Sequence, residues 1–354
     1  TGPGVTKTFT YDDTGDWKDL LTSVTVNGET GQFTYESDGS GTIGNPTHYF
    51  NGDDYELTWK NGRQLASLTR AGRRAWYSYG ADGIRTSKAL MNGDNPPIMH
   101  YYTTQNGKIV REQWGSAQMD FVYDATGRPL ALYYRVKLPN SNEYSGDSYY
   151  YETNQQGDVT GLYKITYDAS TKSLTATRVA SYEYDAWGNV TYSTGEMADI
   201  NPLRYRGYYQ DWESGYYYLQ SRYYDPVIGR FVNADKPELV DFNFSKNLFV
   251  YSGNNPTTLK DDEGEFAITA LLVAGIACSV IGGVLNAATT AASGGDAASI
   301  AISFAGGLAS GLAMTFITGG LGVIAGALVA GFCSGWVDTR MQKNAGKKVN
   351  YTQA

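Results

Sequence analysis

The sequence predicts a mainly β protein built from repeated hairpins, and two observations lead to this fold class. Tyrosine occurs 30 times and glycine 42 times among 354 residues, a composition that favours pleated strands joined by turns with positive φ. An aromatic residue followed shortly by glycine also recurs, mostly at intervals of roughly 20 to 24 residues, as repeat arrays do. We therefore expect residues 1–200 to form a series of β-hairpins.

The hairpin repeat is clearest over residues 121–134, where an alternating strand, a turn at Asp124–Gly127 and a second strand follow one another. The Asp side chain can accept hydrogen bonds from turn amides, and Gly takes a left-handed conformation that costs other residues energy. A plain β-meander with regular turns is the alternative explanation. The aromatic–glycine pairs are Tyr11/Gly15, Tyr35/Gly39, Trp59/Gly62, Tyr79/Gly83, Tyr102/Gly107, Tyr123/Gly127, Tyr151/Gly157 and Tyr184/Gly188.

A polar stretch, Leu138–Asp147, interrupts the repeats. Its Pro, Asn, Ser and Gly residues are typical of turns. We expect an exposed loop that lengthens one hairpin.

A tyrosine-rich segment follows the repeats and carries a family resemblance. It reads Asn201-Pro-Leu-Arg-Tyr-Arg-Gly-Tyr-Tyr and then Gly215-Tyr-Tyr-Tyr-Leu-Gln-Ser-Arg-Tyr-Tyr-Asp-Pro-Val-Ile-Gly-Arg-Phe231. With the Tyr-Asp-x-x-Gly units at 123–127 and 184–188, this order of motifs resembles the RHS/YD-repeat proteins over residues 1–264. The resemblance implies hairpins joined into one spiralling sheet, a hollow shell, with residues 201–264 as the core domain that closes it.

An apolar region covers residues 265–337 and precedes a polar tail at 338–354. Ala267–Ala292 and Ala297–Phe316 are long enough for membrane-spanning helices, and Leu321–Val337 reaches the lower limit. Small residues four apart favour close helix packing. We expect an Ala/Gly-rich α-helical hairpin region, which either contacts a membrane through residues 266–337 or packs as a protected soluble hairpin.

Composition excludes several classes of function. A net charge of -8 without runs of Lys or Arg argues against nucleic-acid binding. Cys278 and Cys333 are the only cysteines, and His48 and His100 the only histidines. Such a small set argues against a disulfide scaffold, a metal centre and a Ser-His-Asp triad, and we expect no cofactor.

The resemblance also implies a pair of aspartates for intramolecular aspartyl proteolysis near residues 261–266. Asp235 stands where the first belongs, and Asp261 follows the family landmark Gly253-Asn-Asn-Pro256. Two carboxylates are needed because one holds a proton while the other activates water. Asp262 replaces the usual Pro, which weakens this interpretation, and turn aspartates are the alternative. We expect Arg230 to be the charge partner of the pair.

The resemblance implies the C-terminal part of a bacterial polymorphic toxin, secreted or at the cell surface, that encloses and delivers an effector in bacterial competition. The implied partners are its own upstream shell, a C-terminal toxin domain, a secretion apparatus and an immunity protein. The chain opens within a repeat and without an initiator Met, so we expect it to continue a longer polypeptide. Two alternatives are a surface adhesin that binds glycans through aromatic rings and an autoprotease that releases its own C-terminal polypeptide.

Overall fold

The computed structural model describes residues 6–13, 17–37, 42–235, 247–259 and 261. All of them belong to one compact unit, residues 1–267. The helices expected over 265–337 and the tail at 338–354 lie outside the described residues. No helix within the described ranges has the length and apolar character needed to cross a bilayer.

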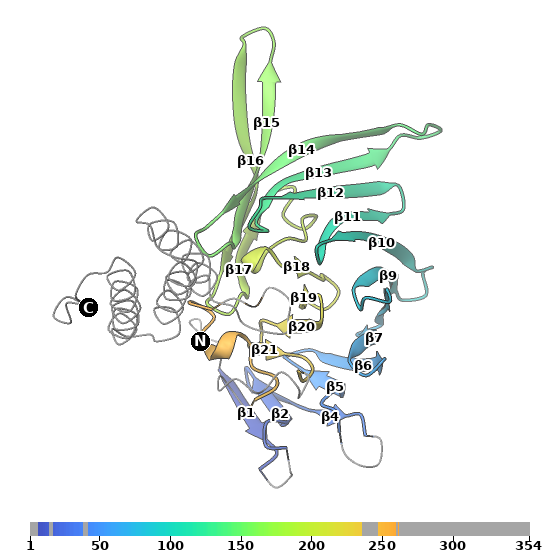
Figure 1. Cartoon of the computed structure of the whole chain (residues 1–354), viewed down its shortest axis with the longest axis vertical. Helices are drawn as coiled ribbons and strands as arrows, with labels where there is room; N and C mark the ends of the chain where they lie inside the picture. The colour runs from blue at the N-terminus through green and yellow to red at the C-terminus, as the bar shows by residue number, and fades with distance from the viewer. Residues whose placement is uncertain (1–5, 14–16, 38–41, 236–246, 260, 262–354) are drawn as a thin grey trace, which may run out of the picture. The chain divides into compact units, whose positions relative to one another are not determined.

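Fourteen consecutive strands form one antiparallel sheet, the repeat sheet, in which each strand pairs with its neighbours in sequence (Figure 1). The mainly β class and the continuous ladder are confirmed. The sheet is open, because β4 and β17 at its two ends are not paired with each other. Enclosure of a volume therefore stays a prediction. The strands are β4 Thr34–Tyr35, β5 Pro46–Phe50, β6 Asp54–Lys60, β7 Gln64–Arg70, β8 Arg73–Tyr79, β9 Arg85–Asn92, β10 Ile98–Gln105, β11 Lys108–Trp114, β12 Ala117–Tyr123, β13 Pro129–Lys137, β14 Tyr144–Thr153, β15 Val159–Asp168, β16 Ser173–Tyr184 and β17 Val190–Thr194.

The first three strands, β1 Lys7–Tyr11, β2 Leu21–Val26 and β3 Glu29–Gln32, form a separate sheet. The aromatic–glycine spacing gave no sign of this break. Gly31 lies against Phe50 so closely that a Cβ would be 2.0 Å from the ring. Phe33 then turns into the core and meets Tyr49 edge-on, with ring centroids 4.9 Å apart. The chain passes from one sheet to the other at this contact.

The predicted turn chemistry is present at the Tyr-Asp-x-x-Gly units. Asp124 Oδ1 accepts hydrogen bonds from the backbone N–H groups of Thr126 and Arg128, at 2.7 and 2.9 Å. Asp185 accepts two equivalent bonds, and Gly127 and Gly188 have φ of 79° and 90°. The Asp therefore satisfies turn amides while the Gly adopts the left-handed conformation.

One repeat uses a different residue for the same turn. Asn154 Oδ1 accepts from the N–H groups of Gln156 and Asp158, at 2.9 and 3.0 Å. Tyr151, which the spacing placed at this turn, instead donates its hydroxyl to Asn201 at 2.7 Å. An amide oxygen thus replaces the carboxylate, because the turn requires only an acceptor.

Aromatic residues at the strand ends tie each hairpin to the chain before it. The strand pairing shifts by one residue beside several of them, as in a β-bulge, and a bulge re-aims a side chain. Each then reaches a backbone carbonyl. The bonds are Tyr35 OH to Leu21 O (3.1 Å), Trp59 Nε1 to Pro46 O (2.6 Å), Tyr79 OH to Leu65 O (3.0 Å), Tyr123 OH to Ile109 O (2.9 Å) and Tyr184 OH to Val159 O (2.8 Å).

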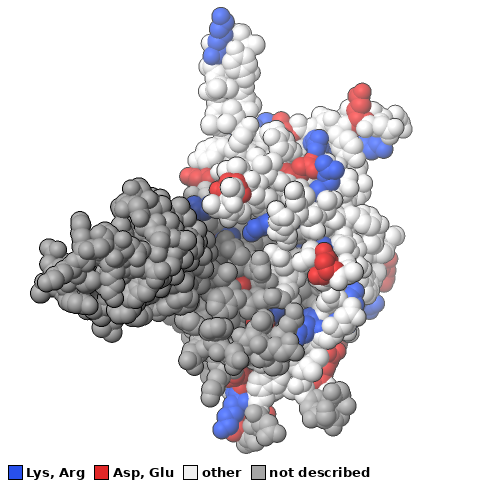
Figure 2. Space-filling model, viewed as in Figure 1, with Lys and Arg blue, Asp and Glu red and all other residues white. Residues whose placement is uncertain are grey.

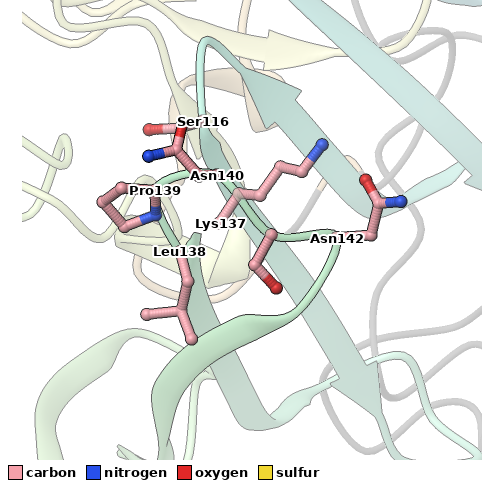
Figure 3. A pocket seen from close by; sticks show the side chains of 7 residues that line it. Ser116, Lys137, Leu138, Pro139, Asn140 and Asn142 are labelled. Atoms are coloured by element: carbon pink, nitrogen blue, oxygen red, sulfur yellow. The ribbon is translucent and has the colours of Figure 1, made fainter.

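The loop predicted at Leu138–Asp147 is shorter than expected. Strand β14 begins at Tyr144, so residues 144–147 belong to the sheet. Gly146 permits this, since a Cβ there would lie 2.0 Å from the carbonyl oxygen of Tyr134. Figure 3 shows the remaining loop, where residues 137–142 and Ser116 line a surface hollow of about 610 Å³. The hollow contains none of the predicted site residues.

The tyrosine-rich segment folds into a small third sheet that lies within the curve of the repeat sheet (Figure 1). Its strands are β18 Tyr209–Gln210, β19 Tyr217–Leu219, β20 Arg222–Asp225 and β21 Arg230–Phe231, with 3-10 turns η1 Tyr205–Gly207 and η3 Ser252–Asn254. We call residues 201–261 the core segment. Its buried tyrosines are Tyr205, Tyr208, Tyr209, Tyr216, Tyr217, Tyr218, Tyr223, Tyr224 and Tyr251. The core segment thus fills one face of the repeat sheet with rings.

Candidate functional site

The core segment docks on the repeat sheet through buried charges. Arg85 and Lys88 on β9 face the core segment and are 0% and 1% exposed. Lys88 Nζ lies 2.8 Å from Asp211 Oδ1 and 3.0 Å from Glu213 Oε2, and Arg85 pairs with the other oxygen of Asp211. Tyr77 donates its hydroxyl to Glu213 at 3.1 Å. Two cations and two carboxylates thus balance one another away from water.

Tyrosine rings surround the Arg85 guanidinium. Its Nε and Nη2 have no hydrogen-bond partner within the described part of the chain. The ring centroids of Tyr218 and Tyr102 lie 4.3 and 4.8 Å from Cζ. Ring faces attract a desolvated cation, so they supply the attraction that the missing hydrogen bonds would give.

The two carboxylates of this network have opposite pKa shifts. Burial alone would raise the pKa of Asp211, but Arg85 and Lys88 outweigh it and hold the pKa below its usual value. Burial raises the pKa of Glu213, and Lys88 only partly opposes this. Asp211 is therefore the carboxylate whose charge the folded chain favours.

A third core carboxylate, Asp225, docks on β5 without an ion pair to any described residue. Tyr49 OH and Asn51 Nδ2 donate to Asp225 Oδ2 at 2.9 and 2.8 Å, and Val227 N donates to Oδ1 at 2.7 Å. Burial raises the pKa of Asp225 despite these hydrogen bonds. Asp225, which precedes Pro226, thus fixes the core segment to the start of the repeat sheet through Tyr49 and Asn51.

The two aspartates predicted from the family motif lie against one arginine. Arg222 Nη2 is 2.9 Å from Asp235 Oδ2 and 3.8 Å from Asp261 Oδ2. The side chains of Arg222 and Asp261 are buried, whereas that of Asp235 is 17% exposed. The structure therefore brings the predicted pair together at a single guanidinium, with one carboxylate nearer to solvent.

A ring contact and hydrogen bonds to backbone atoms hold Arg222, Asp235 and Asp261 in place. The Arg222 guanidinium lies 3.6 Å from the ring centroid of Phe231, and Nη1 donates to Leu248 O at 3.1 Å. Asp235 N donates to the same carbonyl at 2.8 Å. Tyr208 OH donates to the main-chain oxygen of Asp261 at 2.6 Å. Both aspartates are thus positioned by the core segment itself.

Arg230 does not occupy the place expected for it. Its guanidinium lies 4.4 Å from the ring centroid of Phe249, and Nη2 donates to Asp19 O at 3.1 Å. Neither Asp235 nor Asp261 is among its contacts in the described residues. The arginine that lies against both aspartates is Arg222.

The two histidines have structural partners. His100 Nδ1 lies 2.7 Å from Glu112 Oε1, and Tyr209 OH donates to Glu112 Oε2 at 2.8 Å, which adds another bond between sheet and core segment. His48 Nδ1 lies 2.6 Å from Gln32 O. Over the described ranges, no group of three or more His, Cys, Asp or Glu side chains is arranged to hold a metal ion.

An arginine between two aspartates can favour ionisation of one carboxylate, while a less solvated neighbour retains a proton, as aspartyl proteolysis requires. Residues 262–266, where cleavage is expected, lie outside the described residues. The described residues thus place both acids at one guanidinium, next to the segment where cleavage is expected.

The chain is similar in sequence to known nucleases, although no family model matches it. It is 29% identical to the tRNA3(Ser)-specific nuclease WapA of Bacillus spizizenii, over 73% of this chain and 11% of that protein. The tRNA nuclease WapA of Bacillus subtilis is also 29% identical, with the same coverage. The chain spans about a tenth of the length of these relatives.

Among solved structures, the chain is similar to the crystal structure of TcdB2-TccC3-Cdc42, with a TM-score of 0.52 and 20% identity. This similarity covers 73% of the chain and 13% of the solved one, and it concerns the fold. The Tyr-Asp-x-x-Gly turns, the unbroken hairpin ladder and the tyrosine-rich core segment agree with both comparisons. The sequence and fold comparisons thus both agree with the resemblance to RHS/YD-repeat proteins.

Proposed function

We propose that this chain forms part of the wall and the plug of a shell that encloses a toxic effector, within a longer RHS-repeat toxin. The unbroken antiparallel ladder from β4 to β17, with the core segment docked on one face, carries the proposal. A right-handed twist accumulates along such a ladder, so further hairpins would curve it around a volume. The effector would lie elsewhere in the polypeptide, as the short coverage of the relatives allows.

Burial of the aromatic rings of the core segment favours closure by this segment over glycan binding by it. Sugar binding by stacking needs exposed ring faces. Tyr216, Tyr217 and Tyr224 in the core segment are 0% exposed. Rings that pack between the core segment and the sheet serve closure and not recognition.

Electron microscopy of the complete polypeptide tests the shell. We expect a hollow particle with internal density, and an effector that resists added protease until the shell is denatured. An open rod, or an effector digested as fast as in the denatured polypeptide, would contradict enclosure.

We further propose that Asp235 and Asp261, held by Arg222, cleave the polypeptide near residues 261–266. One carboxylate would activate water for attack on the peptide carbonyl, and the other would protonate the leaving nitrogen. The shared guanidinium carries this proposal. Arg222 would favour the ionised form of one acid at a time.

Intact-mass measurement of the complete polypeptide tests proteolysis. We expect two products from the unaltered protein and a single mass from Asp235→Asn or Asp261→Asn. Asp147→Asn is the control, because Asp147 pairs with Lys164 on the repeat sheet. A single intact mass from the unaltered protein would exclude cleavage.

The remaining roles are proposed on the resemblance. A secretion apparatus would bring the polypeptide out of a bacterium, residues 266–337 would contact a membrane during delivery, and an immunity protein would bind the effector. Liposome flotation of the complete polypeptide and of a form lacking 266–337 tests the membrane role. Equal flotation of both forms would rule it out.

A further inference from the structure

The hairpin formed by β15 and β16 runs well beyond its neighbours (Figure 1). β15 and β16 pair out to Asp168 and Ser173. Neighbouring strands accompany them only at the base, since β14 pairs over 149–153 and β17 pairs with residues 181–184. Residues 165–176, the projecting ribbon, therefore pair only with each other among the described residues.

A bulge turns this ribbon away from the sheet. Leu162 lies opposite Ala180 and Tyr163 opposite Arg178, which leaves Val179 without an opposite residue. A bulge increases the local twist and bends the strand. Val179 O accepts the N–H of Met197 at 3.0 Å, and this bond closes the outer edge of β16 at the base. Beyond it, no other strand of the described ranges pairs with the outer backbone edge over Ser173–Arg178.

One face of the ribbon is apolar. Tyr167 lies opposite Leu174 and Ile165 opposite Ala176, and the first three are 62%, 72% and 45% exposed. The opposite face carries the Thr166/Thr175 pair. Figure 2 shows the projection as mostly uncharged. The ribbon is thus amphipathic, with its apolar face in solvent.

The edge lacks the usual protection against pairing. Exposed strand edges are normally blocked by proline, by inward charges or by a covering element, and an isolated two-stranded hairpin is marginally stable in water. Ser173–Thr177 contains neither proline nor charge, and the bulge between β15 and β16 lies at the base. Arg178, the one charged residue of the edge, pairs with Glu152 at the base. Only an extended backbone offers N–H and C=O groups at the spacing of this edge.

We propose that the outer edge of β16, Ser173–Arg178, is a strand-addition site for an extended polypeptide segment of another molecule. The added strand pairs with the edge through its backbone, and its alternate apolar side chains cover Leu174 and Tyr167. Specificity then comes from alternation of apolar and polar residues along the added strand, because strand addition reads alternate side chains beside the backbone ladder.

Binding of a labelled peptide tests the proposal. The probe is fluorescein-labelled Thr-Val-Thr-Val-Thr-Val, followed by fluorescence anisotropy with the whole chain. We expect saturable binding, and binding about tenfold weaker or more for the same peptide methylated on alternate backbone nitrogens, because the lost donors forfeit ladder hydrogen bonds. No binding, or equal binding of the methylated peptide, would overturn the proposal.

Two variants separate the ribbon from other surfaces. Replacement of residues 166–175 by Asn-Gly removes the edge, and replacement of 138–143 by the same turn is the control on the neighbouring hairpin. We expect only the first to abolish binding. Leu174→Lys, which keeps the backbone edge, should weaken binding about tenfold, as the loss of one apolar contact would; full binding by the first variant would overturn the assignment.

Sedimentation of the chain alone distinguishes a second copy from another partner. We expect a monomer. A dimer that disappears when residues 166–175 are replaced would assign the edge to a second copy of the chain and overturn the heterologous partner proposed here.

Discussion

At the scale of single residues, docking of the core segment depends on charges that the sequence did not single out. Lys88 lies two positions before Leu90 on β9, and both are buried. Alternation predicts an apolar residue at such a position. The sequence did contain a signal of this network, namely a Lys at an inward position of a strand and two acids, Asp211 and Glu213, two residues apart in the core segment. A single sequence cannot pair them, because the partners are 123 residues apart.

Replacement of Arg85 tests this network. Arg85→Ala leaves Asp211 in the interior with one cation, and we expect the free energy of unfolding to fall by about 3–5 kcal/mol. Arg178→Ala is the control, since Arg178 and Glu152 are exposed, and it should cost less than about 1 kcal/mol. Urea unfolding measures both, and equal losses would show that the buried network contributes nothing special.

The lowered pKa of Asp211 predicts how stability depends on pH. A carboxyl whose pKa is lower in the folded chain binds fewer protons there, so its contribution is present above about pH 4, the unfolded value, and is lost as pH falls through the folded value. We expect Asp211→Asn to be destabilising at neutral pH, with a deficit that narrows below about pH 4. Measuring both proteins in a Glu213→Gln background removes the opposite shift of Glu213. A constant deficit from pH 7 to pH 3 would contradict this assignment.

The predicted aspartates illustrate what a motif can and cannot locate. Asp235 and Asp261 lie 2.9 and 3.8 Å from one guanidinium nitrogen, which belongs to Arg222 and not to Arg230. Tyr224 lies opposite Phe231 and Asp225 opposite Arg230, so Arg222 shares the face of Phe231 while Arg230 points the other way. Strand register decides this choice, and register depends on the fold of the Asp225–Arg230 turn.

At the scale of elements, the hairpin turn was predicted down to its hydrogen bonds, because Asp and Gly perform their roles within a few residues of one another. The sequence was less informative where contacts are distant. The separate sheet β1–β3 depends on Gly31 against Phe50, and the shortened loop before β14 depends on Gly146 against β13. Neither approach leaves a local pattern in the sequence.

Substitutions at two turn glycines distinguish the energetic cost of backbone strain from the cost of disturbing the contact between the repeat sheet and the core segment. Gly62 and Gly188 have φ of 83° and 90°, but a Cβ at Gly62 meets open space whereas one at Gly188 lies 2.6 Å from the Tyr205 ring. We expect Gly62→Ala to cost about 1–2 kcal/mol from the left-handed backbone alone. Gly188→Ala should cost at least about 1 kcal/mol more, as overpacking does. Urea unfolding of the two variants decides, and equal costs would mean that Tyr205 moves aside freely.

At the scale of the whole molecule, enclosure gives the two faces of the repeat sheet different surroundings. Tyr133 and Tyr134 follow one another on β13 and point to opposite faces. Tyr133 is 39% exposed, whereas Tyr134 packs against the buried core and stacks on Trp114 with ring centroids 6.2 Å apart. Tyr134 is therefore on the face that would line the shell.

Cysteines at these two positions report on closure. In a background without Cys278 and Cys333, we expect Tyr133→Cys to react with a bulky polyethylene-glycol maleimide in both this chain and the complete polypeptide. Tyr134→Cys should also react in this chain, because the repeat sheet is open. In the complete polypeptide its reaction should be at least about tenfold slower, because neighbouring hairpins would exclude the reagent. A tenfold slower reaction corresponds to ~1.4 kcal/mol of protection. Denaturation should restore its reactivity. Equal rates for Tyr134→Cys in the two contexts would mean that the sheet stays open in the complete polypeptide, because a closed wall admits the reagent from one side only.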